Sequence, residues 1–115
     1  MKKVEYSQIV RRKLKVLRGL LTSEFGSEVS RKALKTITDA ARSLEKFEER
    51  GVSVSSMYDI ECDYRYLYVG HNYLFYRIET DKIIIVEIFD DREDFMYKLF
   101  GISTTSQESI DYWDE

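Results

Sequence analysis

The sequence of 115 residues predicts an α+β domain in which an N-terminal helical hairpin packs on one face of a small antiparallel sheet, followed by a short C-terminal helix. Apolar residues recur every three or four positions in the first half, which is typical of amphipathic helices. The second half is rich in β-branched and aromatic residues that turn signals divide into short runs. We therefore expect one domain at 1–102 and an acidic polar tail at 103–115.

The first half predicts a strand and two helices. A strand at 3–6 precedes a helix that Ser7 caps and Gly26 ends, and Ser27 caps a second helix that ends at Gly51. Each helix carries an apolar stripe that needs a surface to cover. The stripe residues are Ile9, Val10, Leu14, Leu17, Leu20, Leu21 and Phe25 on the first helix and Val29, Ala33, Leu34, Ile37, Ala40, Ala41, Leu44 and Phe47 on the second.

The second half predicts the sheet. After a loop at 52–56, the predicted strands lie near 57–61, 64–69, 73–79 and 83–89. Short turns between successive strands make their pairing antiparallel. Alternation along 64–69 places Tyr64, Tyr66 and Tyr68 on one face and Arg65, Leu67 and Val69 on the other.

A final helix is predicted after the last strand. Asp90 and Glu93 have the spacing of a capping box, and Gly101 ends the helix. Phe95, Met96, Leu99 and Phe100 form its apolar side.

Composition excludes several classes of protein. The sequence has one cysteine, Cys62, and one histidine, His71, so it predicts neither an internal disulfide nor a zinc cluster. It has no run of about 20 apolar residues and no signal peptide, so we expect a cytoplasmic protein that does not enter a membrane. Nucleotide-binding and metalloprotease motifs are absent, and we expect no cofactor and no metal.

The net charge of −3 hides an asymmetry. Residues 1–50 carry a net +6 and residues 51–115 a net −9. The two halves can attract each other within the fold, or the basic half can meet an acidic partner or a nucleic acid. The cluster Arg11, Arg12 and Lys13 is the densest part of the basic half.

Few groups in the acidic half can carry chemistry. Cleavage of RNA by its own 2′-hydroxyl requires no metal, but it does require cations at the phosphate and groups that move protons. Arg65, Arg77, Arg92 and Tyr97 are the candidates. The alternative is that the arginines form ordinary ion pairs with neighbouring carboxylates, namely Glu61, Asp63, Glu79 or Glu87, and that the tyrosines line a sheet.

These residues carry a family resemblance. The block YRYLYVGHNYLFYRIETDKIIIVEIF, followed by DDREDFMYKLFG, resembles the RelE/ParE superfamily of toxins from type II toxin–antitoxin modules. The ordered set of motifs is a "YR-x-L-x-V" strand, a short turn, an "FYRI" strand, an aliphatic strand and an Arg-Asp region leading to "LFG". The resemblance covers about residues 3–101. Residues 49–51 lack the proline that family members commonly carry there.

The resemblance implies a plasmid-stabilisation toxin that a cognate antitoxin neutralises. We expect its growth inhibition to be ribosome-dependent, metal-independent cleavage of mRNA. The alternatives are inhibition of DNA gyrase, as in ParE-like members, or an inactive homologue that only binds antitoxin. Tyr73 is followed by Leu74, where the ribonuclease branch often has an arginine.

Site residues follow from the resemblance together with the residue chemistry. By position, Arg65 and Arg92 match basic residues of the family, and Tyr97 lies close to the tyrosine of the ribonuclease branch. The predicted catalytic set is Arg65, Arg77, Arg92 and Tyr97; the RNA- or target-binding set is Tyr64, Tyr66, Tyr68, His71 and Lys98; and the antitoxin-binding set is Arg11, Arg12 and Lys13.

Overall fold

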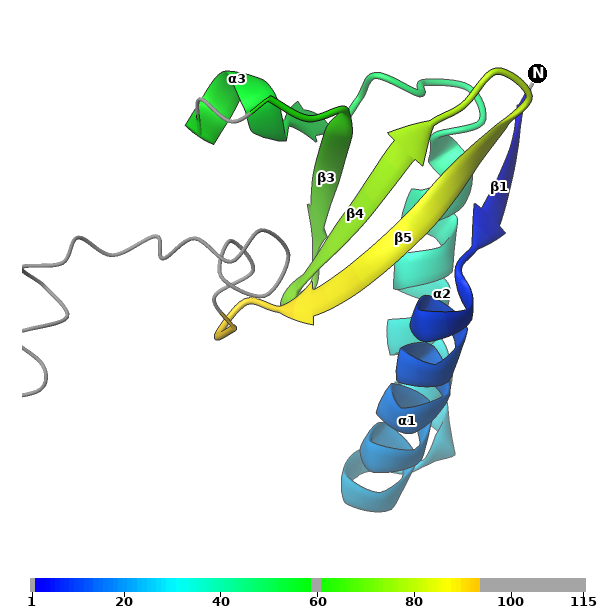
Figure 1. The fold of residues 1–115 in the computed structure, drawn as a ribbon. Coiled ribbons are helices and arrows are strands. Elements are labelled where there is room, and N and C mark those ends of the chain that lie inside the picture. The colour runs from blue at the N-terminus through cyan, green and yellow to red at the C-terminus, as the bar shows by residue number, and fades with distance from the viewer. Residues whose placement is uncertain (1, 59–60, 94–115) are drawn as a thin grey trace, which may run out of the picture.

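A computed structural model describes residues 2–58 and 61–93 (Figure 1). The elements are β1 (Lys3–Tyr6), α1 (Gln8–Phe25), α2 (Ser27–Ser43), β2 (Val52–Ser53), α3 (Val54–Tyr58), β3 (Tyr64–Val69), β4 (Asn72–Ile78) and β5 (Lys82–Asp90). The antiparallel pair α1 and α2 lies against one face of the sheet, as the sequence predicts (Figure 1). Within the described ranges, no helix is long and apolar enough to cross a membrane.

The sheet has five strands in the order β1-β5-β4-β3-β2. Neighbouring strands from β2 to β5 pair antiparallel, as their short turns predict. β1 instead pairs parallel with β5, with Tyr6 opposite Ile85, so the sheet is mixed and not wholly antiparallel. Because three helices and three strands separate β1 from β5 in the chain, no turn sets the direction of this pairing.

The helix boundaries agree with the sequence for α1 but not for α2. The Ser7 side chain accepts a hydrogen bond from the Val10 amide and caps α1 as predicted. Gly26, with φ of 93°, is the N-cap of α2, so the predicted cap at Ser27 is wrong. α2 ends at Ser43 and not at Gly51, because the following amides bond to carbonyls three residues back in a tight turn.

The apolar residues of α1 form two stripes instead of one. Val10 is buried, and Leu14 and Leu17 pack with it against α2 and the sheet. Ile9 and Leu20, which the sequence places on this same stripe, are 48% and 57% exposed. Phe25, Val29 and Phe47, also assigned to buried stripes, are exposed as well.

The predicted strand near 57–61 is wrong. Residues 57 and 58 belong to α3, residue 61 lies in no strand, and 59–60 fall outside the described residues. The strand that does pair with β3 is β2, within the predicted loop. β2 has two residues only, too short for a period of two to reveal it.

The two faces of the sheet carry different cores, as the alternation predicts. Beneath the helices lie Leu67, Leu74 and three isoleucines of β5, Ile83, Ile85 and Ile88. The opposite face carries an aromatic cluster of Tyr66, Phe75 and Phe89 with Val54, and Tyr64 and Tyr73 pack against it. The spacing 83, 85, 88 departs from a period of two because the pairing of β4 with β5 shifts at Phe75/Tyr76, which is a β-bulge.

Among the described residues, Tyr76 is the one polar side chain buried in the core cluster beneath the helices, and its hydroxyl is buried together with its ring. Its hydroxyl donates to the Glu48 carbonyl at 2.7 Å and accepts from the Gly51 amide at 2.9 Å. A Cβ at position 51 would lie 2.6 Å from the Tyr76 ring, so only glycine fits. Burial raises the pKa of Tyr76, against an opposing effect of the Gly51 hydrogen bond. Tyr76 therefore fixes the loop that joins α2 to β2.

The chain leaves the sheet through the predicted capping pattern. The Glu93 carboxylate accepts from the Asp90 amide at 2.8 Å, and Asp90 accepts from the Arg92 amide at 2.9 Å. The predicted final helix and the predicted tail at 103–115 lie outside the described residues.

Removing the Tyr76 hydroxyl tests its role. We expect Tyr76→Phe to lower the free energy of unfolding by about 1–3 kcal/mol, because it leaves a buried amide and a carbonyl without their partner. Tyr68→Phe is the matched control, since the Tyr68 hydroxyl sits on a side chain that is 53% exposed, and its cost should stay within about 0.5 kcal/mol. Urea denaturation measures both, and equal losses would contradict the assignment.

Candidate functional site

The three arginines of the predicted catalytic set do not meet. Arg65 and Arg77 lie at the same end of the β3–β4 ladder, where Arg65 pairs with Tyr76 and Arg77 with Tyr64. Because Tyr76 and Arg77 are consecutive in β4, the two arginines lie on opposite faces. Arg92 follows Asp90, which pairs with Asn72 at the other end of β4. Arg77 is five positions after Asn72, a distance of about 17 Å along a strand.

Each of these arginines also has a partner within the chain. Arg65 donates to the carbonyls of Gly51 at 2.8 Å and Glu49 at 3.2 Å, so it holds the loop that Tyr76 holds. Arg77 pairs with Glu79 at 2.7 Å, which agrees with one of the ion pairs considered from the sequence. Tyr97 and Lys98, which also belong to the predicted sets, lie outside the described residues.

Arg92 forms a small charged turn with the end of β5. Its Nε lies 2.9 Å from Asp90 Oδ1, and its side chain is 88% exposed. Hydrogen bonds from Arg92 hold the pKa of the Asp90 carboxyl below its usual range. The guanidinium is thus engaged by a carboxylate, although solvent reaches it.

The only histidine belongs to a surface cluster at the β3–β4 turn. The Asp91 carboxylate accepts from the Tyr68 hydroxyl at 2.7 Å and lies 3.1 Å from His71 Nδ1. The hydrogen bond to Asp91 raises the pKa of Tyr68, which makes it a poorer proton donor. The Tyr68 ring also packs on Tyr73, with 4.9 Å between centroids. His71 itself is 85% exposed, and within the described ranges the cluster contains no lysine or arginine.

The three basic residues predicted to bind antitoxin divide between two surfaces. Arg11 and Arg12 are exposed on α1, whereas Lys13 turns toward the end of β5. The Lys13 ammonium lies 2.7 Å from Glu87 and 3.1 Å from the Ile88 carbonyl. It also lies 4.5 Å from the centroid of the Phe89 ring. Lys13 therefore joins α1 to the sheet.

Arg11 and Arg12 line a cationic groove between α1 and α2. The groove has a volume of about 830 Å³, and Tyr6, Leu14 and Leu34 are among the residues that line it. Five of its lining side chains are cations, namely Arg11, Arg12, Lys15, Arg18 and Arg31. Arg31 pairs with Glu28, but no lining residue is a carboxylate. Five cations and no carboxylate among its described lining residues give this cationic groove a positive potential.

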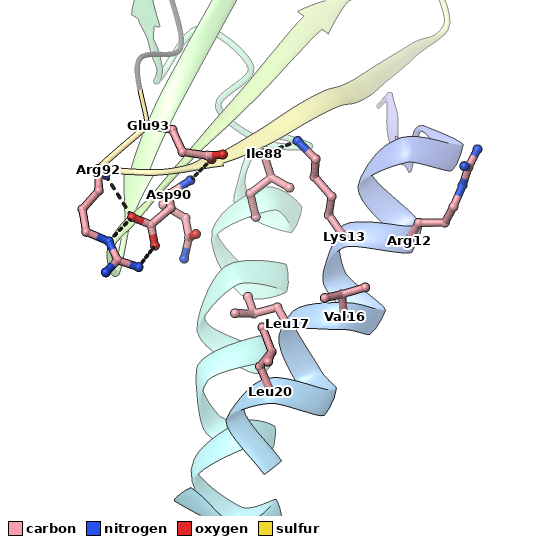
Figure 2. A pocket seen from close by; sticks show the side chains of 10 residues that line it. Arg12, Lys13, Val16, Leu17, Leu20, Ile88, Asp90, Arg92 and Glu93 are labelled. Atoms are coloured by element: carbon pink, nitrogen blue, oxygen red, sulfur yellow. Dashed lines mark hydrogen bonds and ion pairs between the residues drawn. The ribbon is translucent and has the colours of Figure 1, made fainter. Parts of the chain in front are cut away.

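A second groove lies on the other flank of α1, between that helix and the end of β5 (Figure 2). It has a volume of about 720 Å³. Val16, Leu17 and Leu20 from α1 face Ile88 across it, and Arg12 and the Asp90–Glu93 turn form its rim (Figure 2). Val16 is 63% exposed, which is unusual for a valine on a helix that packs against a sheet. We call this surface the apolar groove.

Reasoning from sequence missed the apolar groove and the partner of Lys13. Val16 does not fit the buried stripe of α1, and that misfit was the available signal for a second stripe. Glu87 gave a weaker signal for the partner of Lys13. It lies between Ile85 and Ile88, whose spacing of three interrupts the alternation of buried isoleucines at the bulge. Bulges change the direction of nearby side chains, which simple alternation cannot predict.

Comparison with known proteins adds a family and a fold. Residues 4–95 match the family model described as ParE toxin of type II toxin-antitoxin system, parDE. Among solved structures, a chain titled "Chromosomal ParDE TA system from P. aeruginosa" matches with a TM-score of 0.66 and 17% sequence identity. That match covers 78% of this chain and 96% of the other, and at such identity it shows a shared fold. Curated proteins gave no match.

The contacts of Lys13 predict a structural role for it. Lys13→Met should lower the free energy of unfolding by about 1–2 kcal/mol, because it leaves the largely buried Glu87 carboxylate without its cation. Lys15→Met is the matched control on the same helix, since Lys15 is exposed and has no ion pair within residues 2–58 and 61–93. The control should change stability by less than about 0.5 kcal/mol in the same urea titration. A larger effect at Lys15 would contradict the assignment.

Proposed function

Because the chain belongs to the ParE toxin family of type II toxin–antitoxin systems, we propose that it arrests growth by binding DNA gyrase and not by cleaving mRNA. The observation that carries this choice is the separation of Arg65, Arg77 and Arg92. Cleavage of RNA requires cations and proton-transfer groups arranged around a single phosphate. Inhibition by binding requires only a surface that fits the target.

The electrostatics of the arginines support the same choice. Glu79 and Asp90 each place a carboxylate within 2.9 Å of the guanidinium that would have to hold a phosphate. A phosphate would have to displace that carboxylate, which costs part of the binding energy. The carbonyls of Gly51 and Glu49 hold Arg65 at the loop, on the opposite face of the sheet from Arg77.

Two assays on the same protein separate the mechanisms. We expect the purified toxin to block DNA supercoiling by gyrase, and we expect mapped mRNA ends in arrested cells to match those in growing cells. The toxin bound to its antitoxin serves as the control and should leave supercoiling intact. New mRNA ends within translated codons, together with unimpaired supercoiling, would overturn the proposal in favour of the ribonuclease mechanism.

Membership of the family also gives the chain an antitoxin as its partner. We propose that an acidic segment of this antitoxin lies in the cationic groove between α1 and α2. The support is electrostatic, because the groove combines five cations with apolar side chains in its lining and no carboxylate. Of the three residues predicted from the sequence to bind antitoxin, Arg11 and Arg12 line this groove and Lys13 does not. Lys15 and Arg18 line it as well.

Charge reversal in the groove tests the antitoxin site. We expect Arg11→Glu combined with Arg18→Glu to weaken antitoxin binding at least about tenfold and to reduce its dependence on salt, because two attractive contacts become repulsive. Lys3→Glu combined with Lys46→Glu is the matched control, since it makes the same change in net charge at two exposed residues outside the groove. Calorimetric titration at several salt concentrations measures both. Equal losses in the two variants would remove the groove from the interface.

A further inference from the structure

One row of exposed side chains on α1 carries opposite charges at its two ends and apolar side chains between them. Arg12, Val16, Leu20 and Glu24 follow one another at intervals of four and are all exposed. Side chains four apart form a continuous ridge on a helix surface. Along the chain, this ridge presents a cation, two apolar side chains and an anion.

If a two-fold axis perpendicular to α1 relates two copies of the chain, the ridge of one copy faces the same ridge of the other in the reverse direction. The axis crosses the ridge midway between Val16 and Leu20, so residue 12 of one copy faces residue 24 of the other, and residue 16 faces residue 20. Arg12 then meets Glu24 of the second copy at both ends, and Val16 meets Leu20 twice in the middle. A self-complementary patch of this kind is what a symmetric dimer requires.

The local structure leaves room for a second helix. Gly19 lies between Val16 and Leu20, and a Cβ built there would have no heavy atom within 4 Å. The missing side chain lets a second backbone approach closely, and ridges of this spacing pack at a crossing angle of about −50°. The apolar groove, with Leu17 and Ile88, continues the apolar surface beside the ridge (Figure 2).

The ends of the ridge are not neutralised within the described part of the chain. Neither Arg12 nor Glu24 forms an ion pair within residues 2–58 and 61–93. The ridge is neutral in sum, unlike the cationic groove on the other flank of α1. An acidic segment gains more from that groove, since along the ridge it would meet Glu24 as well as Arg12.

We propose that the Arg12–Glu24 ridge is the docking surface for a second copy of this chain, with two α1 helices crossing antiparallel in a symmetric dimer. Val16 packs against Leu20 of the second copy, and Arg12 pairs with Glu24 of the second copy. The dimer does not depend on gyrase as the target. It does share Arg12 with the cationic groove, so antitoxin binding and dimer formation compete for that side chain.

A charge swap distinguishes this dimer from every other arrangement. The full chain, prepared free of antitoxin, is studied by sedimentation equilibrium over a wide range of concentration. Wild type should show a monomer–dimer equilibrium. Arg12→Glu and Glu24→Arg should each weaken the dimer at least about tenfold, because symmetry makes every single change act at two contacts. The double variant should return the dissociation constant to within about threefold of wild type, since opposite charges face each other again.

Three results would overturn the proposal. A wild-type chain that stays monomeric at all concentrations contradicts it, and so does a double variant that remains as weak as the single ones. If the chain is monomeric and Val16→Ser weakens antitoxin binding, the ridge is an antitoxin surface. All substituted side chains are exposed, and circular dichroism verifies that each variant is folded. Because supercoiling is not measured here, failure of the dimer leaves the gyrase proposal standing.

Discussion

The arrangement of this domain depends on a buried tyrosine hydroxyl that holds a loop. Tyr76 reaches from the middle strand to the backbone of Glu48 and Gly51, and Arg65, its direct neighbour across the ladder, binds the carbonyl of Gly51. These bonds hold the segment between α2 and β2 against the sheet. The helical hairpin is therefore fixed over one face, and the outward surfaces of α1 are left free.

The same constraint bears on function. Arg65 holds the loop through its Nη1, and the other two arginines of the predicted set pair with carboxylates at opposite ends of β4. Chains that share a fold can differ in chemistry, because function resides in particular side chains placed on it. In this chain the three arginines contact groups of the chain itself at three separate places on the sheet.

α1 has three surfaces with three distinct properties. Its buried side, around Val10, packs on the sheet and on α2. One flank carries the cationic groove without a carboxylate, and the other carries a neutral ridge and an apolar groove. Lys13 lies where the last two meet and is bound to Glu87. One basic residue of the first half, Lys13, therefore pairs with an acidic residue of the second half inside the fold. Other basic residues of α1 remain exposed on the flank that carries the cationic groove.

The sequence by itself determined the features that depend on neighbours in the chain. The cap at Ser7, the span of α1, the strands near 64–69, 73–79 and 83–89 to within one residue at each end, and the separation of Tyr66 from Leu67 all follow from local periodicity and turn chemistry. Only the tertiary structure decided the parallel pairing of β1, the end of α2 at Ser43 and the partners of the arginines. It also decided that Val16 and Leu20 stay exposed. These features depend on which distant segment covers a surface or reaches a charge, and a pattern of three or four residues carries no information about that.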